Sequence, residues 1–253
     1  MIGPVRSLLP AHDGDLDDEA LAEAYAYPRP GRTPVRWLRA NMVSTVDGAA
    51  AGADGRSDSV STPADRRVLR VLRALADVVL VGAGTARAEA YGPVRVRPAL
   101  SPGREGRGQP PAPVLAVVSR SLDLDPSSQL FAAAAARTVV VTSHAAPAAR
   151  RARLEPVADL IVAGADEVNL SAALDALAAR GLTRMLCEGG PTLLAALSAA
   201  GLLDELCLTL TPSLLGGSAG RILSGPTLGT PHDLRLAAVL EEDDTLLTRW
   251  PRR

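Results

Sequence analysis

The chain has 253 residues, of which 47% are hydrophobic and 22% charged, a composition sufficient for a globular core. Its formal net charge of −1 gives no electrostatic reason to expect nucleic acid or an anionic membrane as a partner. All 27 basic residues are arginine, which excludes Schiff-base chemistry on lysine and the lysine-containing phosphate loop.

The cysteines and histidines form no established metal or disulfide pattern. Cys187 and Cys207 lie twenty residues apart inside apolar runs, as expected of buried thiols. The histidines, at 12, 144 and 232, have no second candidate ligand at an established spacing, so we expect no metal site and no serine–histidine triad. No apolar run reaches the roughly 18–20 residues that span a bilayer, and no secretory signal is visible. We therefore expect a cytoplasmic protein.

Residues 1–34 are rich in proline and acidic side chains and predict an N-terminal arm. A short helix is expected over Asp18–Tyr25, and Tyr25 and Tyr27 are candidate docking aromatics. The arm would lie on the main body or on a partner subunit. Residues 35–253 are then expected to form a single domain.

The first elements of that domain have clear local signals. Val35–Val43 predicts a strand. Thr62 as N-cap and Pro63 at the first position predict a helix that continues to about Ala76. The continuous apolar run Asp77–Val81 is typical of a strand covered on both faces.

A glycine turn and a long loop follow this strand. Gly82-Ala83-Gly84-Thr85 leads into a short helix that ends near Tyr91. Residues 92–113 include six prolines and four glycines and predict an exposed loop. Because the same alternation of strands and helices continues on both sides, we interpret this loop as an insertion within one domain.

Alternating strands and helices continue to the end of the chain and predict an α/β fold. The expected architecture is a mostly parallel central sheet with a C-terminal antiparallel hairpin and flanking helices. The remaining expected elements are strands at Val114–Val118, Thr138–Thr142, Leu160–Val162, Arg184–Cys187 and Leu206–Leu210, helices at Asn169–Arg180 and Leu193–Ala200, and a hairpin of Leu234–Leu240 with Asp244–Trp250.

Unusual residues gather where the predicted strands end, which is where open α/β sheets bind ligands. Two of these ends are glycine turns that open helices, and helix starts attract phosphates through free N–H groups. Arg120, between two serines, suits a third phosphate, and a phosphorylated dinucleotide such as NADPH meets these demands. The candidate residues are Val43, Ser44, Asp47, Gly82, Ala83, Gly84, Thr85, Ser119, Arg120, Thr142, Glu188, Gly189, Gly190 and Thr192.

Each of these features has a structural alternative. Gly82–Gly84 matches only the first half of the Rossmann glycine pattern. Asp47 followed by glycine is also a common turn, Ser119–Ser121 a common solvated turn, and Arg73 could be the exposed edge of its helix. Glu188 ends a buried strand, so its carboxylate must be solvated within a site or paired.

Three motifs together resemble a known family. They are Asn41–Gly48, Val81–Glu89 with Tyr91-Gly92-Pro93, and Cys187–Thr192 with Gly201–Leu206. In this order and spacing they resemble the reductase domain of the riboflavin-biosynthesis deaminase-reductases, in the form of the stand-alone pyrimidine-reductase-like proteins. The resemblance covers about residues 36–250. The zinc pattern of the deaminase half is absent from the sequence.

The resemblance implies a dihydrofolate-reductase-like fold, NADPH as hydride donor and a homodimer. The implied reaction reduces the ribosyl side chain of a phosphoribosylamino-pyrimidinone to the ribityl chain, by hydride delivery to C1′ of the ring-opened imine. Asp47 would lie beside the nicotinamide and would either orient the substrate or supply the proton. The residues implied to line the coenzyme are Val43, Gly82, Thr85, Ser119 and Gly189. Those implied to face the substrate are Ser57, Arg73, Glu188 and Glu89, which stands where the family often has aspartate, with Arg95 or Arg97 near the phosphate.

Three functions remain open from the sequence. The first is an NADPH-dependent reductase of a riboflavin-pathway pyrimidine. The second is a reductase of the same fold that acts on dihydrofolate or another pteridine, because function depends on the site and not on the fold. The third is a catalytically idle dinucleotide-binding dimer.

Overall fold

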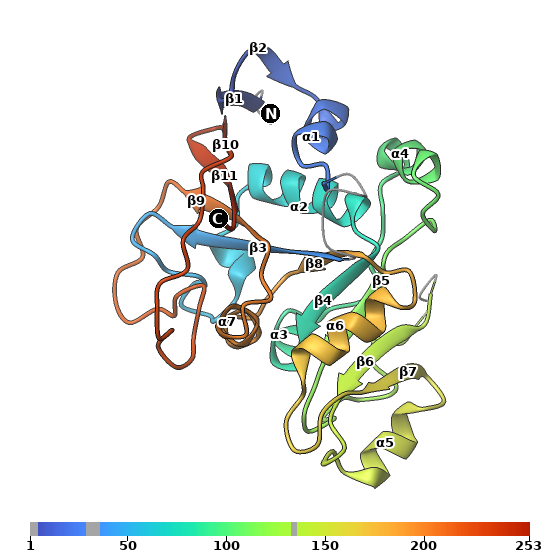
Figure 1. Ribbon diagram of the computed structural model, residues 1–253. Helices are drawn as coiled ribbons and strands as arrows, with labels where there is room; N and C mark the ends of the chain where they lie inside the picture. Colours follow the sequence, from blue (N-terminus) through green and yellow to red (C-terminus); the bar gives the residue numbers. More distant parts are fainter. Residues whose placement is uncertain (1–4, 29–35, 133–135) are drawn as a thin grey trace.

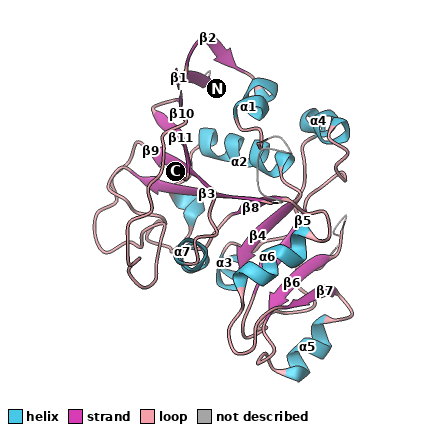
Figure 2. Cartoon of the chain, in the orientation of Figure 1, coloured by secondary structure: helices cyan, strands magenta, loops and turns pink. Residues whose placement is uncertain are grey.

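The computed structural model describes residues 5–28, 36–132 and 136–253, which form one eleven-stranded sheet with helices on both faces (Figures 1 and 2). The strand order is β2-β1-β10-β11-β9-β3-β8-β4-β5-β6-β7. The strands are β1 (Val5–Leu9), β2 (Ala11–Leu16), β3 (Trp37–Thr45), β4 (Val78–Gly82), β5 (Val114–Val118), β6 (Thr138–Thr142), β7 (Ala158–Val162), β8 (Arg184–Cys187), β9 (Glu205–Thr211), β10 (Ala238–Glu242) and β11 (Thr245–Pro251).

Helices follow most of the parallel strands. No helix in the described part of the chain is long and apolar enough to cross a membrane. The helices are α1 (Asp18–Ala24), α2 (Pro63–Leu75), α3 (Ala83–Ala88), α4 (Ser101–Gly106), α5 (Ala148–Leu154), α6 (Leu170–Ala178) and α7 (Pro191–Ala199), with 3-10 turns η1 (Ser57–Ser59) and η2 (Pro98–Leu100).

The sheet confirms the predicted α/β architecture. Strands β9, β3, β8, β4, β5, β6 and β7 pair in parallel, so their carboxyl ends share one edge. The predicted C-terminal hairpin is present as β10 and β11, which pair antiparallel. Its first strand begins later than predicted, because Leu234 makes only an isolated bridge to Arg252.

Strand β4 is covered on both faces, as its uninterrupted apolar sequence predicts. Val79 and Val81 belong to the cluster that contains Leu72 of α2. Val78 and Leu80, which alternate with them along the strand, belong to the opposite cluster with Leu194 of α7. This alternation follows from the period of two in a strand and fixes which helix packs on which face.

The N-terminal segment, predicted to lie on the main body or on a partner subunit, extends the edge of the sheet. Strand β1 pairs antiparallel with β10 and with β2, and α1 packs against α2 (Figure 1). The short helix and the docking of Tyr25, which is 1% exposed, agree with the sequence prediction. Strands β1 and β2 were not predicted, because Ala11–Leu16 is polar and lacks alternation. Val35, the predicted start of the next strand, lies outside the described residues.

The segment 92–113 differs from the predicted exposed loop, because part of it closes the end of α2. The Arg104 side chain is 1% exposed and donates to the carbonyl oxygens of Ala74 at 3.0 Å and Ala76 at 2.7 Å. Gln109 Nε2 donates to Leu75 O at 3.1 Å and to Asp77 Oδ1 at 2.7 Å. The last carbonyls of a helix have no partner within it, so these side chains supply the missing donors.

A buried ion cluster joins the N-terminal segment to the sheet. Glu205 accepts from Arg39 Nη2 at 2.8 Å and from Arg249 Nε at 2.7 Å, which links β3, β9 and β11. Arg39 also donates to the carbonyl of Tyr25 at 2.6 Å and stacks on the ring of Tyr27 at 4.4 Å. Burial alone would raise the pKa of Glu205, but the charges of Arg39 and Arg249 outweigh burial and hold that pKa below its usual range.

We expect Glu205→Gln to lower the free energy of unfolding by about 3–5 kcal/mol, because it leaves the fully buried Arg39 without a counter-charge. Urea denaturation near neutral pH measures this loss. Asp175→Asn is the control, because its exposed pair with Arg36 is expected to contribute under about 1 kcal/mol. Since the folded pKa of Glu205 is depressed, its contribution to the free energy of unfolding is lost as pH falls through that pKa. The free energy of unfolding of the variant should therefore depend less on pH in the acid range than that of the wild type. A loss no larger than that of the control would contradict this account.

Candidate active site

Two glycine turns meet at the shared carboxyl edge of the parallel strands. One follows β4 and the other follows β8, and the two strands are paired neighbours. Gly82 N donates to Gly189 O at 2.8 Å, and Glu188 N donates to Leu80 O at 2.9 Å. The ladder between the strands therefore continues into the turns and holds them side by side.

Glycine is required where the turns touch. A Cβ on Gly190 would come within 3.0 Å of Thr85 Oγ1, closer than real side chains allow. Gly189 has φ +86°, the left-handed region that favours glycine, and a Cβ there would lie 3.3 Å from Met42 Sδ. A Cβ on Gly84, in contrast, would meet nothing within 4 Å, so open space lies beside the first turn of α3.

The two helices that start at these turns have no side-chain cap. Neither Gly82 before α3 nor Gly190 before α7 can supply one, and Pro191 at the first position of α7 has no N–H. The free N–H groups, including that of the exposed Thr192, are therefore available to an external acceptor. Two adjoining sets of such donors beside an open space fit a ligand with two linked phosphates.

Glu188 is paired and not free. Its carboxylate accepts from Arg73 Nε at 2.7 Å and Nη2 at 2.6 Å, and from the Tyr91 hydroxyl at 2.7 Å. Its side chain is 3% exposed, while that of Arg73 is 25% exposed and keeps contact with solvent. Burial, and then the charge of Glu188, raises the pKa of Tyr91 well above its usual value, so the phenol remains a donor. Tyr91 lies in one of the three motifs, but the sequence does not identify it as a site residue, because a tyrosine carries no signal of its partner.

Ser57 and Glu89, both predicted to face the substrate, bind each other. Glu89 Oε1 accepts from Ser57 N at 2.8 Å and from Ser57 Oγ at 2.9 Å. Arg56 Nε lies 3.5 Å from Glu89 Oε2. The carboxylate thus holds η1 against the end of α3.

The predicted phosphate arginines lie in a region of excess positive charge. Arg95 and Arg97 are exposed, and within the described residues neither forms an ion pair. Burial, followed by the nearby charge of Arg97, lowers the pKa of Arg70 on α2. Arg70 is therefore a further candidate that was missed, because its proximity to Arg97 arises only in the fold.

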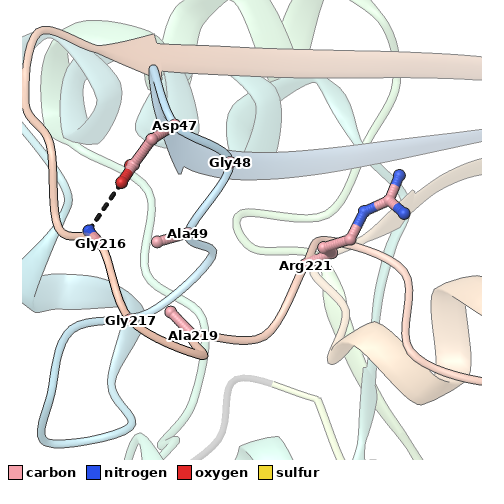
Figure 3. Close-up of a pocket in the computed structure, with 7 residues that line it drawn as sticks. All are labelled: Asp47, Gly48, Ala49, Gly216, Gly217, Ala219 and Arg221. Carbon is pink, nitrogen blue, oxygen red and sulfur yellow. Dashed lines mark hydrogen bonds between the residues drawn. The ribbon is translucent and has the colours of Figure 1, made fainter.

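Asp47 caps a turn of the β9–β10 loop. Its carboxylate accepts from Thr45 Oγ1 and from Leu215 N at 3.1 Å. It also accepts from Gly216 N at 2.7 Å, the bond drawn in Figure 3. The hydrogen bonds from Thr45 and Gly216 lower the pKa of Asp47, so the carboxylate stays ionised at neutral pH. An ionised group can orient a ligand but holds no proton to give.

A cavity of about 170 Å³ lies beside this carboxylate, between the turn after β3 and the β9–β10 loop (Figure 3). The same loop continues to the start of α7, where Ser224 N donates to Pro191 O at 3.2 Å. The loop therefore connects the Asp47 corner to the glycine turns. The residues that line the cavity are Asp47, Gly48, Ala49, Gly216, Gly217, Ala219 and Arg221.

The other predicted coenzyme residues are mostly buried. Val43, Ser44 and Thr142 are at most 8% exposed, so they would offer backbone groups to a ligand, not side chains. Ser119 Oγ accepts from Leu122 N at 3.0 Å and so stabilises the turn after β5. Arg120 extends from this turn into solvent, where it forms an ion pair with Glu167.

Several known proteins are similar to this chain in sequence and in fold. The model described as the RibD C-terminal domain matches residues 36–246. A protein of Archaeoglobus fulgidus named 2,5-diamino-6-ribosylamino-4(3H)-pyrimidinone 5′-phosphate reductase is 30% identical over 70% of this chain and 80% of its own length. A protein of the same name from Methanothermobacter thermautotrophicus is 32% identical over 72% and 81%. The crystal structure of a pyrimidine reductase-like protein from Corynebacterium diphtheriae superposes with a TM-score of 0.79 and 28% identity, over 92% of this chain and 98% of that one.

The contact between the turns predicts opposite effects of two glycine substitutions. Gly190→Ala should lower the free energy of unfolding by about 1–3 kcal/mol, because the new methyl overlaps Thr85. Gly84→Ala should leave it unchanged or raise it by up to about 1 kcal/mol, because the site is open and the unfolded chain loses freedom. Thermal and urea unfolding of both variants measure the difference. Equal stability of the two would show that the turns are not in contact.

Proposed function

The chain is an oxidoreductase of the RibD C-terminal domain family, and we propose that it reduces the ribosyl side chain of a phosphoribosylamino-pyrimidinone to the ribityl chain. Two relatives at 30% and 32% identity are named as reductases of such a substrate. Their names favour a pyrimidine over the pteridine alternative. The observation that carries the proposal is the contact between two uncapped, glycine-based helix starts at the carboxyl edge of the sheet.

A reduced nicotinamide coenzyme, NADPH in this proposal, supplies the hydride when bound. The residues that would hold its diphosphate are the backbone N–H groups of Ala83–Thr85 at the start of α3 and those of Gly190 and Thr192 at the start of α7. Arg120 beside Ser119 would bind the additional phosphate that distinguishes NADPH from NADH. The backbone N–H donors of the two turns are fixed by the fold before a ligand arrives, which reduces the entropy lost on binding.

The substrate side of the site is assigned to the paired arginine and its neighbours. Glu188 and Tyr91 hold the guanidinium of Arg73 in one orientation, and the remaining N–H groups of Arg73 would bind the substrate. Arg97 with Arg70 would attract its phosphate, since this region carries excess positive charge.

Asp47 is assigned an orienting role. Reduction of an imine needs one hydride at carbon and one proton at nitrogen. The ionised Asp47 carboxylate is held by backbone donors and can position a hydroxyl or a water of the substrate site, so the proton comes from water.

The function is tested by coenzyme oxidation with defined substrates. We expect NADPH oxidation to accelerate when a phosphoribosylamino-pyrimidinone is added, with mass spectrometry detecting a product two mass units heavier. Dihydrofolate should give no acceleration, and NADH should serve less well than NADPH. Acceleration by dihydrofolate alone would establish the pteridine alternative. NADPH binding without turnover on either substrate would establish the catalytically idle one.

We expect Asp47→Asn to lower kcat/KM by about 10- to 100-fold through the loss of the negative charge, with a smaller change in the Kd for NADPH. Asp54→Asn is the matched control, because Asp54 is likewise exposed and hydrogen-bonded to Ser59 and to a backbone N–H. Because the pKa of Asp47 lies below its usual value, its ionisation should not limit activity between about pH 6 and 8. Activity that falls with rising pH in wild type but not in Asp47→Asn would instead make Asp47 the proton donor.

A further inference from the structure

The guanidinium assigned to the additional phosphate already has an anionic partner within the chain. Arg120 Nη1 forms an ion pair with Glu167 Oε1. We propose that Glu167 is a determinant of coenzyme preference, because its carboxylate competes with a nucleoside 2′-phosphate for Arg120. This proposal rests on the proposed function, and it assigns a role to a residue that neither the motifs nor the resemblance identified.

The β7–α6 connection holds Glu167 in place. Ala163 N donates to Thr142 O at 2.8 Å, and Asn169 N donates back to Ala163 O at 3.0 Å. Ser143 Oγ donates to the carbonyl of Asp166 at 3.1 Å. The bonds of Ala163 and Asp166 attach the loop to the end of β6, and the bond from Asn169 to Ala163 closes the loop after Glu167.

A sharp bend at Gly164 completes this loop. Its φ is +93°, and a Cβ there would overlap the carbonyl oxygen of Glu167. The backbone at Glu167 is therefore folded closely onto the start of its own loop. The backbone that carries Glu167 is therefore held in place, and its side chain reaches Arg120 at the end of β5.

The other partner is fixed in the same way. Ser119 N donates to Val141 O at 2.9 Å, and Ser119 Oγ accepts from Leu122 N at 3.0 Å. Arg150 Nη1 donates to the carbonyl of Ser121 at 3.0 Å. The turn that carries Arg120 is thus bound from two directions, so Arg120 and Glu167 are brought together by their backbones.

A second ion-pair group follows Arg120 in the same connection. Arg87 and Arg150 lie 3.9 and 4.0 Å from the carboxylate of Asp123, and Arg150 also donates to the carbonyl of Ser121. Removal of the Glu167 charge takes away the negative charge that faces Arg120, which strengthens the attraction of that guanidinium for a phosphate.

The ion pair is weak enough for a ligand to displace. The side chains of Arg120 and Glu167 are 67% and 72% exposed, and exposed pairs contribute little to stability. A phosphate offers Arg120 a bidentate, charge-assisted partner and so exchanges with the carboxylate. A 2′-phosphate that binds must nevertheless first displace the Glu167 carboxylate from Arg120. A nucleotide with a 2′-hydroxyl leaves the Arg120–Glu167 pair intact. Glu167 therefore reduces the selectivity for the phosphorylated coenzyme.

The experiment measures nucleotide binding without turnover. Isothermal titration calorimetry of the whole chain at low salt gives the Kd values for adenosine 2′,5′-bisphosphate and adenosine 5′-monophosphate. The variants are Glu167→Gln, Arg120→Ala and the control Asp159→Asn. Asp159 forms an exposed pair with Arg137 that is chemically equivalent but lies at the opposite, amino end of β6 and β7.

Glu167→Gln should tighten binding of the bisphosphate by about twofold to fivefold, the range of exposed ion pairs, and leave the monophosphate unchanged. Arg120→Ala should weaken the bisphosphate alone, and Asp159→Asn should change neither. The gain in Glu167→Gln should shrink as salt is added.

Unchanged or weaker bisphosphate binding in Glu167→Gln, while Arg120→Ala still weakens it, would overturn the role of Glu167 and leave the coenzyme site standing. Weaker monophosphate binding in Glu167→Gln would show that the carboxylate instead binds a ribose hydroxyl, which also overturns the proposal. If wild type binds neither nucleotide nor NADPH, the proposed function itself fails.

Discussion

The pairing of β4 with β8 is the constraint on which the site depends. Parallel pairing brings the carboxyl ends of the two strands together, and the bond from Gly82 N to Gly189 O extends that pairing into the turns. Two helix starts that are far apart in sequence, at Ala83 and Pro191, thereby present their free N–H groups to the same region. Any side chain on Gly190 would separate them, so the glycines serve the contact between the turns as much as the approach of a ligand.

Arginine takes the place of lysine throughout this chain, and the geometry of the guanidinium explains how one residue type can serve several purposes. The planar guanidinium donates in several directions at once, so one side chain can close a helix end or bind a carboxylate through two bonds. Arg104 satisfies the carbonyls at the end of α2, Arg39 anchors the N-terminal segment to Glu205, and Arg73 binds Glu188 through two nitrogens. In the last case the same interaction that neutralises a buried acid also orients the group assigned to the substrate. In the proposed function, stability and substrate binding would therefore depend on one ion pair.

Much of the fold was predictable where the signal is local. The cap at Thr62, the proline after it and the apolar run of β4 each determine their element within a few residues, and the observed boundaries agree closely. Strands β1 and β2 and helices α4 and α5 were missed. The sequences of β2, α4 and α5 are polar or rich in proline, glycine or arginine. Strand β1 has only five residues and is stabilised by its pairing with the distant strand β10.

The sequence by itself determined which kinds of residue stand at the carboxyl ends of the strands, because strand ends and helix starts follow from local patterns of apolar, glycine and proline residues. It could not determine their partners. Only the tertiary structure decided that Glu89 binds Ser57, that Glu188 is neutralised by Arg73 and Tyr91, and that Arg120 faces Glu167. These partners are 32 to 115 residues apart along the chain, or lie on loops whose positions the sheet order fixes. Contacts of that kind arise from the order and direction of the strands, and no periodicity in the sequence encodes them.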